Sequence, residues 1–318
     1  MKKVLACAAL VALVAGCAAP AKPSPNAPPA VQAPAEAQPE GRTWSTPDAI
    51  REMFPTWLEP AEPFRVIGNI YYVGSKGLGL YLITTPDGDI LIDGGLPENA
   101  DMALASIRKL GFDPADVKIL LNTHAHFDHS GGLARLKQVT GAPFYASEGD
   151  RSALEGGFYL GSEDLHEVDA PPVKVDHVIA DGETVSLGGT TLTARITPGH
   201  TRGCTSWWLT VEEAGKPYDV LLFCSATVAA NRLAPDPQYD GIVDDYRHTF
   251  EITKDWKPDV FLANHPEFSG LWKARARQEA GDLLAFVDDT AFPAYIQAMQ
   301  ADFEKQLAKQ QAAAGGTD

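Results

Sequence analysis

The sequence predicts an α/β protein in which two β-sheets pack face to face and helices cover the outer faces. In each half of the chain, strand-like segments come first and helical segments follow, an order that permits this layered arrangement. Hydrophobic residues form 45% of the 318 residues, enough for a sizeable core, and 28 glycines with 24 prolines indicate many turns. A dense cluster of potential metal ligands follows directly on a buried strand, where layered α/β folds commonly collect ligands.

Local patterns predict the elements of the N-terminal half in chain order. β-Branched and aromatic residues are typical of strands, and an Asp-Gly pair between apolar runs is typical of a hairpin. A proline near the start and a glycine at the end delimit a helix. These patterns predict a strand at 64–74, a hairpin at 79–95, a helix at 97–111, a buried strand at 117–123 and the opening of a helix at 130–141.

The C-terminal half repeats the order of strands and then helices. Asp-Gly and Gly-Gly pairs separate short strand-like runs, and apolar residues with helical spacing mark a last helix that we expect to pack on a sheet face. The predicted elements are short strands within 178–200, two strands around a hairpin loop at 204–225, a helix at 244–256, a strand at 259–265, and helices at 271–281 and 292–310.

The N-terminus has the pattern of a secretory signal. Residues 1–16 combine two lysines with an apolar stretch that is too short to span a bilayer stably. The closing "VAGC" resembles a bacterial lipobox, which implies cleavage before Cys17 and lipid attachment to its sulfur; the alternative is ordinary cleavage near Ala19. A Pro/Ala-rich, disordered tether is expected at 17–41 and a single folded domain at 42–318. We therefore expect an exported, periplasmic protein that is lipid-anchored to the outer membrane.

Two cysteines, Cys204 and Cys224, remain in the expected folded domain. An exported protein can pair them, but two cysteines do not make a disulfide framework. Because both also lie close to the motifs described below, the sequence favours unpaired cysteines.

The stretch "THAHFDHSGG" at 123–132 contains four good metal ligands within six residues. A catalytic zinc usually takes three protein ligands and keeps one position open, so four ligands in one loop indicate two metals. His124 and His126 are two residues apart and point the same way in an extended backbone, so they can bind one ion together. Asp128 and His129 lie at the turn into a helix and can face a second ion. Each ion then needs one more ligand from elsewhere.

Five other histidines could complete these sites. His200 in "ITPGHTRG" and His265 in "DVFLANHPEF" each follow a predicted strand, which makes them the best candidates. His166 and His248 lie among charged residues and are expected to be solvated. His177 lies in the alternating run "VKVDHVI" and is expected on a strand surface.

The motifs "HAHFDH", "TPGHT", the strand-end "NH" and "YLITTPDGDILIDGG" resemble the metallo-β-lactamase superfamily over roughly residues 60 to 290. The resemblance implies a four-layer αββα sandwich of two mixed β-sheets with outer helices and a dinuclear metal site. The motif "HAHFDH" by itself does not specify β-lactam hydrolysis, because the superfamily also contains thioesterases, lactonases, phosphodiesterases and RNA-processing nucleases.

Two departures from the superfamily pattern narrow the expected activity. Many of its hydrolases carry a metal-bridging Asp after the strand that here ends in "LLFC", whereas this chain continues with Ser225, Ala226 and Thr227. True β-lactamases of the superfamily share that loss. In the largest β-lactamase subclass, an Arg stands at the position of His129. A His at this position resembles the third subclass, and the resemblance implies that Cys224 is not needed as a metal ligand.

The resemblance implies two Zn²⁺ ions and a role for each ligand. It assigns His124, His126 and His200 to the first zinc, and Asp128, His129 and His265 to the second. Bound zinc lowers the pKa of a water towards neutrality, and the resulting metal-bound hydroxide attacks the lactam carbonyl. Asp128 binds metal and helps to orient this nucleophile. No serine nucleophile is required, so no acyl-enzyme should accumulate.

Two pairs of residues are expected to contact the substrate. Ser225 and Thr227 lie where the third subclass places hydroxyls that bind the substrate carboxylate; the alternative is that they are turn residues ending a strand. Phe158 and Tyr159 beside glycines suit a mobile apolar wall; the alternative is a loop that packs its own aromatics.

The expected function is zinc-dependent hydrolysis of penicillins, cephalosporins and carbapenems by a monomer that confers antibiotic resistance. The alternatives are a lactonase or a hydroxyacyl-thioester hydrolase on the same site, or a non-catalytic zinc-binding lipoprotein. The formal net charge of −16 and the export signal argue against a nuclease, because nucleic-acid binding wants a basic surface. The expected partner is a small β-lactam, with membrane contact only through a lipid on Cys17.

Overall fold

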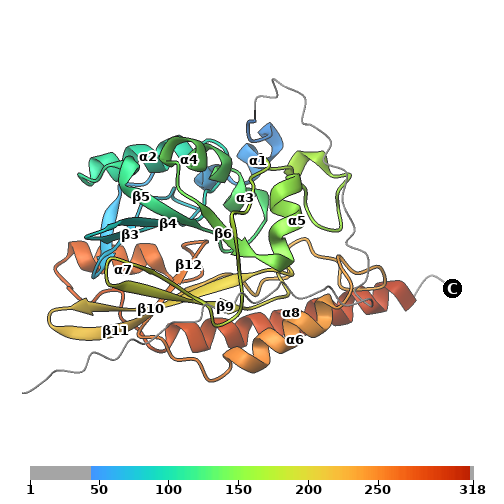
Figure 1. The fold of residues 1–318 in the computed structure, drawn as a ribbon. Coiled ribbons are helices and arrows are strands. Elements are labelled where there is room, and N and C mark those ends of the chain that lie inside the picture. The colour runs from blue at the N-terminus through green and yellow to red at the C-terminus, as the bar shows by residue number, and fades with distance from the viewer. Residues whose placement is uncertain (1–43, 316–318) are drawn as a thin grey trace, which may run out of the picture. The chain divides into compact units, whose positions relative to one another are not determined.

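Two mixed β-sheets lie face to face at the centre of the structure, and helices form the outer layers (Figure 1). The computed structural model describes residues 44–315, which belong to one compact unit, Gly41–Asp318. The predicted signal peptide at 1–16, and the tether at 17–41, lie outside the described residues. The layers confirm the predicted α/β sandwich.

The first sheet places several loops at one edge. Its neighbouring strands are antiparallel from β1 to β4 and parallel from β4 to β7. Because parallel strands end at the same edge, the segments after β4, β5 and β6 lie close together there. In spatial order the strands are β1 (Phe64–Ile67), β2 (Ile70–Tyr72), β3 (Tyr81–Thr85), β4 (Gly88–Ile92), β5 (Val117–Leu121), β6 (Phe144–Ser147) and β7 (His177–Ile179).

The second sheet brings a further set of strand ends together. Strands β8 to β11 are antiparallel to their neighbours, and β12 is parallel to β11. The C-terminal ends of β9, β11 and β12 therefore share one edge. In spatial order the strands are β12 (Val260–Ala263), β11 (Lys216–Phe223), β10 (Thr205–Glu213), β9 (Thr190–Ile196) and β8 (Thr184–Leu187).

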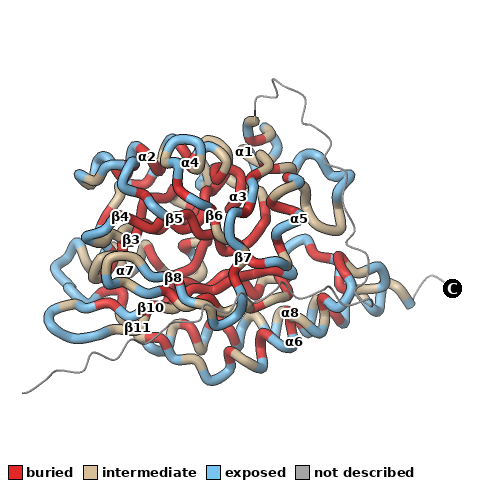
Figure 2. The backbone as a smooth tube through the Cα atoms, viewed as in Figure 1, coloured by how far each residue is buried: buried red, intermediate tan, exposed pale blue. Residues whose placement is uncertain are grey.

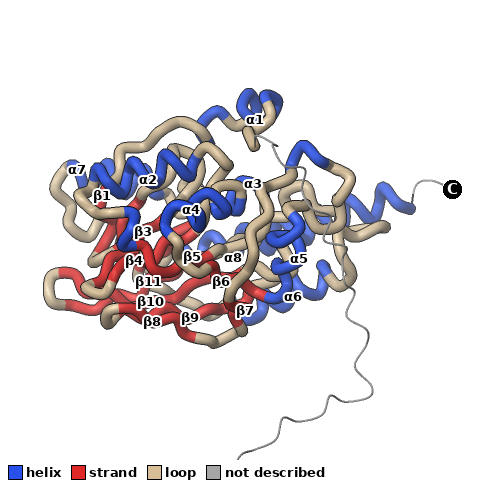
Figure 3. The backbone as a smooth tube through the Cα atoms, turned by 45° about the horizontal axis from the view of Figure 1, so that its top comes forward, coloured by secondary structure: helices blue, strands red, loops and turns tan. Residues whose placement is uncertain are grey.

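Helices cover the outer face of each sheet. The apolar faces of α2, α4 and α5 pack on the first sheet, and those of α6 and α8 pack on the second (Figure 3). No helix within residues 44–315 combines the length and apolar character needed to cross a membrane. The helices are α1 (Asp48–Met53), α2 (Asn99–Lys109), α3 (Phe127–Ser130), α4 (Leu133–Thr140), α5 (Glu148–Gly156), α6 (Ile242–Thr253), α7 (Leu271–Glu279) and α8 (Ala291–Gly315).

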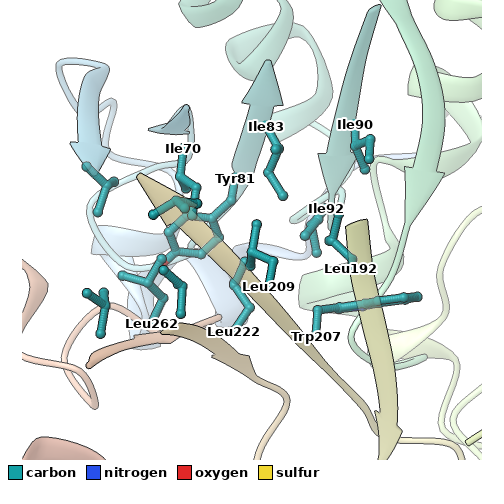
Figure 4. Packing of buried hydrophobic residues seen from close by; sticks show 14 of the residues in the cluster. Ile70, Tyr81, Ile83, Ile90, Ile92, Leu192, Trp207, Leu209, Leu222 and Leu262 are labelled. Atoms are coloured by element: carbon teal, nitrogen blue, oxygen red, sulfur yellow. The ribbon is translucent and has the colours of Figure 1, made fainter. Parts of the chain in front are cut away.

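The main core lies between the two sheets, where buried residues concentrate (Figure 2). Side chains of a strand alternate between its two faces. Ile83 and Ile90 therefore point into this core, whereas their neighbours Leu82 and Leu91 point towards the helices. Strands buried on both faces read as continuous apolar runs, which is the pattern seen here. Figure 4 shows side chains of both sheets meeting: Ile70, Tyr81, Ile83, Ile90, Ile92, Leu192, Trp207, Leu209, Leu222 and Leu262.

Two local differences separate the structure from the sequence-based expectation. The strand predicted at 64–74 is a hairpin of β1 and β2, because Gly68 turns the chain with a φ of 54°. Strand β6 and helices α1 and α5 were not predicted, because β6 has four residues, α1 has six, and the helical segment "EGDRSALEG" of α5 is mostly polar. The other predicted elements are present, with ends that differ by a few residues.

Candidate metal centre

The predicted ligands meet at the shared edge of the two sheets. His124 follows β5, His200 follows β9 and His265 follows β12. The structure brings them together with the cluster in two groups, and within each group the ligand atoms lie within 4.8 Å of one another. One group is His124, His126 and His200; the other is Asp128, His129 and His265. The three remaining histidines of the described chain, His166, His177 and His248, are exposed, as predicted.

The first group consists of three buried imidazoles. The Nε2 atoms of His124 and His200 are 3.2 Å apart, and the His126 and His200 rings have centroids 4.5 Å apart. Burial lowers the pKa of His124 and His126 well below the usual value, and it lowers the pKa of His200 to about 4. These rings are therefore neutral at pH 7, the state in which histidine binds a metal.

Surrounding oxygens fix which ring nitrogen carries the proton. The Nδ1 of His200 lies 2.8 Å from the carbonyl oxygen of Thr227, and the Nδ1 of His265 lies 3.3 Å from that of Gly77. A carbonyl only accepts hydrogen bonds, so each Nδ1 donates, and Nε2 is the nitrogen that faces the other ligands of its group. Such outer contacts are typical of metal-binding histidines.

The second group combines one carboxylate with two imidazoles. An Asp128 oxygen lies 3.2 Å from the Nε2 of His129 and 3.4 Å from that of His265. Burial by itself raises the pKa of Asp128, but the two adjacent histidines lower this pKa well below its usual value. Burial likewise lowers the pKa of His265, but the Asp128 carboxylate outweighs it and raises that pKa. Asp128 is thus an anion at neutral pH.

The spacing of the ring nitrogens fits bound zinc. The Nε2 atoms of His129 and His265 are 3.1 Å apart, close to the 3.2 Å between the corresponding atoms of His124 and His200. A tetrahedral zinc about 2.0–2.1 Å from each nitrogen places neighbouring nitrogens about 3.3 Å apart. Lone pairs that face each other at such distances repel unless a cation lies between them. The residues present therefore suit one ion in each group.

Asp93 is a supporting residue whose part in the site was not predicted. It is buried, and its carboxylate accepts hydrogen bonds from the backbone N–H of Thr123 at 2.6 Å, the Thr123 hydroxyl at 2.8 Å and the Asn122 amide at 3.2 Å. Burial raises the pKa of Asp93 to about 6. One oxygen lies 3.7 Å from the Nδ1 of His129, a buried nitrogen that has no hydrogen-bond partner among residues 44–315. The signal in the sequence is the aspartate at the end of the apolar run "ILID".

A cavity of about 600 Å³ opens over both groups. Its size is that of a small-molecule site. His126, Asp128, His200 and His265 lie in its wall, together with Arg232 and Glu267. The remaining wall is largely apolar and includes Ile50, Phe54, Trp57, Phe127, Leu165, Val168 and Phe268.

The predicted substrate contacts are only partly in this wall. Thr227 and Tyr159 line the cavity, and the Tyr159 ring stacks on His126 with centroids 4.4 Å apart. Ser225 is buried, and its oxygen lies 3.1 Å from the Thr227 hydroxyl, so it contacts the cavity only through Thr227. Phe158 is partly buried and packs against the core between the first sheet and its helices. Sequence reasoning missed Arg232, which has no motif around it.

The two cysteines form a disulfide, which corrects the expectation that they are unpaired. The Cα atoms of Cys204 and Cys224 are 5.8 Å apart. Strands β10 and β11 are antiparallel, and their pairing brings the residue before β10 next to the residue after β11. Neither sulfur is then available as a thiolate ligand, which is consistent with His129 completing the second group.

Comparisons with known proteins agree with this geometry. The profile of the metallo-β-lactamase superfamily matches residues 80–214. The crystal structure of a subclass B3 metallo-β-lactamase from Bradyrhizobium japonicum is 49% identical with a TM-score of 0.79, and the match covers 81% of this chain and 98% of that one. The chain belongs to the metallo-β-lactamase superfamily. The metallo-β-lactamase fold and the resemblance to the third subclass, both inferred from the motifs, are thereby confirmed.

Two curated relatives with other activities are less similar in sequence. A hydroxyacylglutathione hydrolase from Rhodospirillum rubrum is 29% identical over 132 residues, which are 42% of this chain and 41% of that protein. An N-acyl homoserine lactonase from Bacillus thuringiensis is 24% identical over 215 residues, which are 59% of this chain and 80% of that protein. This chain therefore spans less than half of the hydrolase.

Proposed function

We propose that this chain is a zinc-dependent β-lactamase that hydrolyses the amide bond of penicillins, cephalosporins and carbapenems and thereby confers antibiotic resistance. The observation that carries the proposal is the second ligand group, in which Asp128, His129 and His265 converge within 4.8 Å beside a complete histidine triad. No carboxylate follows β11, where the sequence reads Cys224, Ser225, Ala226, Thr227. The high identity to a subclass B3 enzyme supports the same activity.

The ligand groups would hold two Zn²⁺ ions. When bound, zinc lowers the pKa of a coordinated water towards neutrality and polarises a carbonyl oxygen. Asp128 stays ionised beside His129 and His265, so it can accept a hydrogen bond from a water in the cavity and orient that water. The apolar wall excludes bulk water, which strengthens every electrostatic contact inside.

The substrate carboxylate would meet Thr227 and Arg232. β-Lactams carry this carboxylate beside the ring nitrogen. The Arg232 guanidinium donates to the carbonyl oxygen of Gly161 at 2.6 Å, the Ser162 hydroxyl at 3.1 Å and the carbonyl oxygen of Asp236 at 3.2 Å. These bonds hold the side chain in place and use three of its five N–H groups. Each terminal nitrogen keeps one N–H for an anion.

Arg232→Met tests this contact. A hydrogen bond to a charged group contributes about 1.5–3 kcal/mol, so KM for a cephalosporin should rise by about 10- to 100-fold while kcat changes little. Steady-state kinetics on a chromogenic cephalosporin measures both constants. Arg247→Met, which replaces an exposed arginine on α6, is the matched control and should leave KM unchanged. An unaltered KM in Arg232→Met would rule out this role.

The activity itself is tested with a substrate panel. Zinc-loaded protein should hydrolyse a chromogenic cephalosporin, a chelator should abolish turnover, and added zinc should restore it. The similarities to a lactonase and to a hydroxyacylglutathione hydrolase favour two rivals, so an N-acyl homoserine lactone and a hydroxyacyl thioester are assayed in parallel. Zinc-loaded protein without β-lactam turnover would overturn the proposal. Turnover of the lactone or the thioester alone would then indicate a related hydrolase, and no turnover at all would indicate a non-catalytic zinc-binding lipoprotein.

We further propose that the enzyme acts as a periplasmic monomer anchored to the outer membrane through a lipid on Cys17. The support is the lipobox-like "VAGC" and the Pro/Ala-rich segment that follows it. Fractionation of cells that produce Cys17→Ser would contradict lipid anchoring if the variant stayed in the membrane fraction like the wild type.

A further inference from the structure

The Asp150 carboxylate lies behind the first ligand group, at the start of α5. It is buried, with 2% of its surface exposed. One oxygen accepts hydrogen bonds from the backbone N–H of Ala125 and the hydroxyl of Thr201, both at 2.9 Å. The other oxygen accepts a hydrogen bond from the backbone N–H of Gly203 at 2.8 Å. All three partners are donors that belong to the protein, so both carboxylate oxygens are engaged in structural hydrogen bonds.

The partners of Asp150 are placed beside the three histidines of the first group. Ala125 lies between His124 and His126, and Thr201 directly follows His200. These two segments follow strands of different sheets, β5 and β9. The Asp150 carboxylate is therefore hydrogen-bonded to both of the chain segments that contain the three histidines of the first group.

Two glycines allow α5 to come this close. A Cβ on Gly149 would lie 2.7 Å from the backbone of Arg202 and Gly203, and a Cβ on Gly203 would lie 2.7 Å from the Asp150 carboxyl carbon. The Ser147 hydroxyl also donates to the carbonyl oxygen of Gly203 at 2.5 Å. The junction of β6 and α5, "SEGD", and the loop "TRGC" thus form one close contact.

We propose that Asp150 is a positioning residue for metal binding by the first group: it holds the backbones of the two loops so that His124, His126 and His200 converge. This inference rests on the metal site of the proposed function. An asparagine has the same shape but presents an NH₂ in place of one oxygen. It would therefore face a backbone N–H with another donor and lose at least one of the three hydrogen bonds.

Zinc affinity is the direct test, measured in the Asp128→Ala background so that only the first group can hold the ion. Competition with a chromophoric chelator gives the dissociation constant. Adding Asp150→Asn should raise this constant by about 10- to 100-fold, as removal of supporting contacts around metal ligands typically does. The matched control is Asp89→Asn, because Asp89 is also a buried aspartate but lies at the far end of β4. Asp89→Asn should leave the constant unchanged.

A second pair of variants separates positioning from a general loss of stability. In the same background, Thr201→Val removes one donor to Asp150, whereas Thr201→Ser keeps the hydroxyl. The valine variant should bind zinc more weakly than the serine variant. Equal affinities in this pair, or an Asp150→Asn variant that binds zinc as tightly as its parent, would overturn the inference while leaving the proposed function intact. Loss of all zinc binding in Asp128→Ala alone would contradict the metal assignment and, with it, this inference.

Discussion

Asp128→Ala is expected to lose one zinc equivalent and to lower kcat/KM for a chromogenic cephalosporin by more than about 100-fold. Asp128 supplies the only negative charge in the second ligand group, and its oxygen lies 3.2 Å and 3.4 Å from the Nε2 atoms of His129 and His265. Without it, two neutral imidazoles would have to hold a divalent cation. Loss of a merely supporting residue costs about 10- to 100-fold, so loss of a charged ligand should cost more.

Metal analysis after dialysis and steady-state kinetics measure both parts of this prediction. The matched control is Asp289→Ala, because Asp289 is an exposed aspartate whose neighbour Asp288 bonds to Asp259, at the end of β12 opposite to His265. The control should keep two zinc equivalents and its turnover. Near-normal turnover in Asp128→Ala, or retention of both zinc equivalents, would refute the assignment of Asp128 as a ligand.

The convergence of the six candidate ligands could be predicted because each of them carries its own local signal. Four ligands lie in one six-residue stretch, and His200 and His265 each follow an apolar run that reads as a strand. Strand ends of a layered fold gather at a common edge, so the spacing along the chain was enough to place these side chains together. The same reasoning correctly set aside His166, His177 and His248.

The supporting residues could not be predicted because their hydrogen-bond partners are distant along the sequence and come close only in the folded protein. Asp93 bonds to residues about 30 positions away, and Asp150 bonds to partners 25, 51 and 53 positions away. The run "ILID" marks Asp93 as a residue at a strand end, but no pattern within either segment identifies these hydrogen-bond partners. Helix α5, which carries Asp150, was itself missed because its sequence is polar. Arg232 is likewise defined only by the cavity that it faces.

The burial of Ser225 shows a related limit of reasoning from resemblance. The resemblance placed Ser225 and Thr227 together as substrate contacts. Residues two apart point the same way only in an extended strand, and β11 ends at Phe223. The residues that follow are outside the strand, so this alternation no longer applies: Thr227 lines the cavity and Ser225 is buried beside it.

Removing the disulfide is expected to lower the free energy of unfolding by about 3 kcal/mol. Cys204 and Cys224 are 20 positions apart, and a cross-link that closes a loop of this size restricts the unfolded chain by about that amount. The bond also lies next to the first ligand group, because Cys204 follows His200 by four residues and Cys224 precedes Thr227 by three. The carbonyl oxygen of Thr227 receives the Nδ1–H of His200. Zinc affinity should therefore fall together with stability.

Equilibrium unfolding in denaturant measures the stability of Cys204→Ala, Cys224→Ala and the double variant. Excess chelator is present throughout, so that zinc binding does not add to the free energy of unfolding. Either single substitution breaks the same bond, so the double variant should lose little more than each single variant. Effects that add fully would contradict the pairing, because independent buried cysteines contribute separately. The non-additivity therefore tests the bond itself, whereas the size of the loss tests how strongly it stabilises the edge of the sheets where the ligands converge.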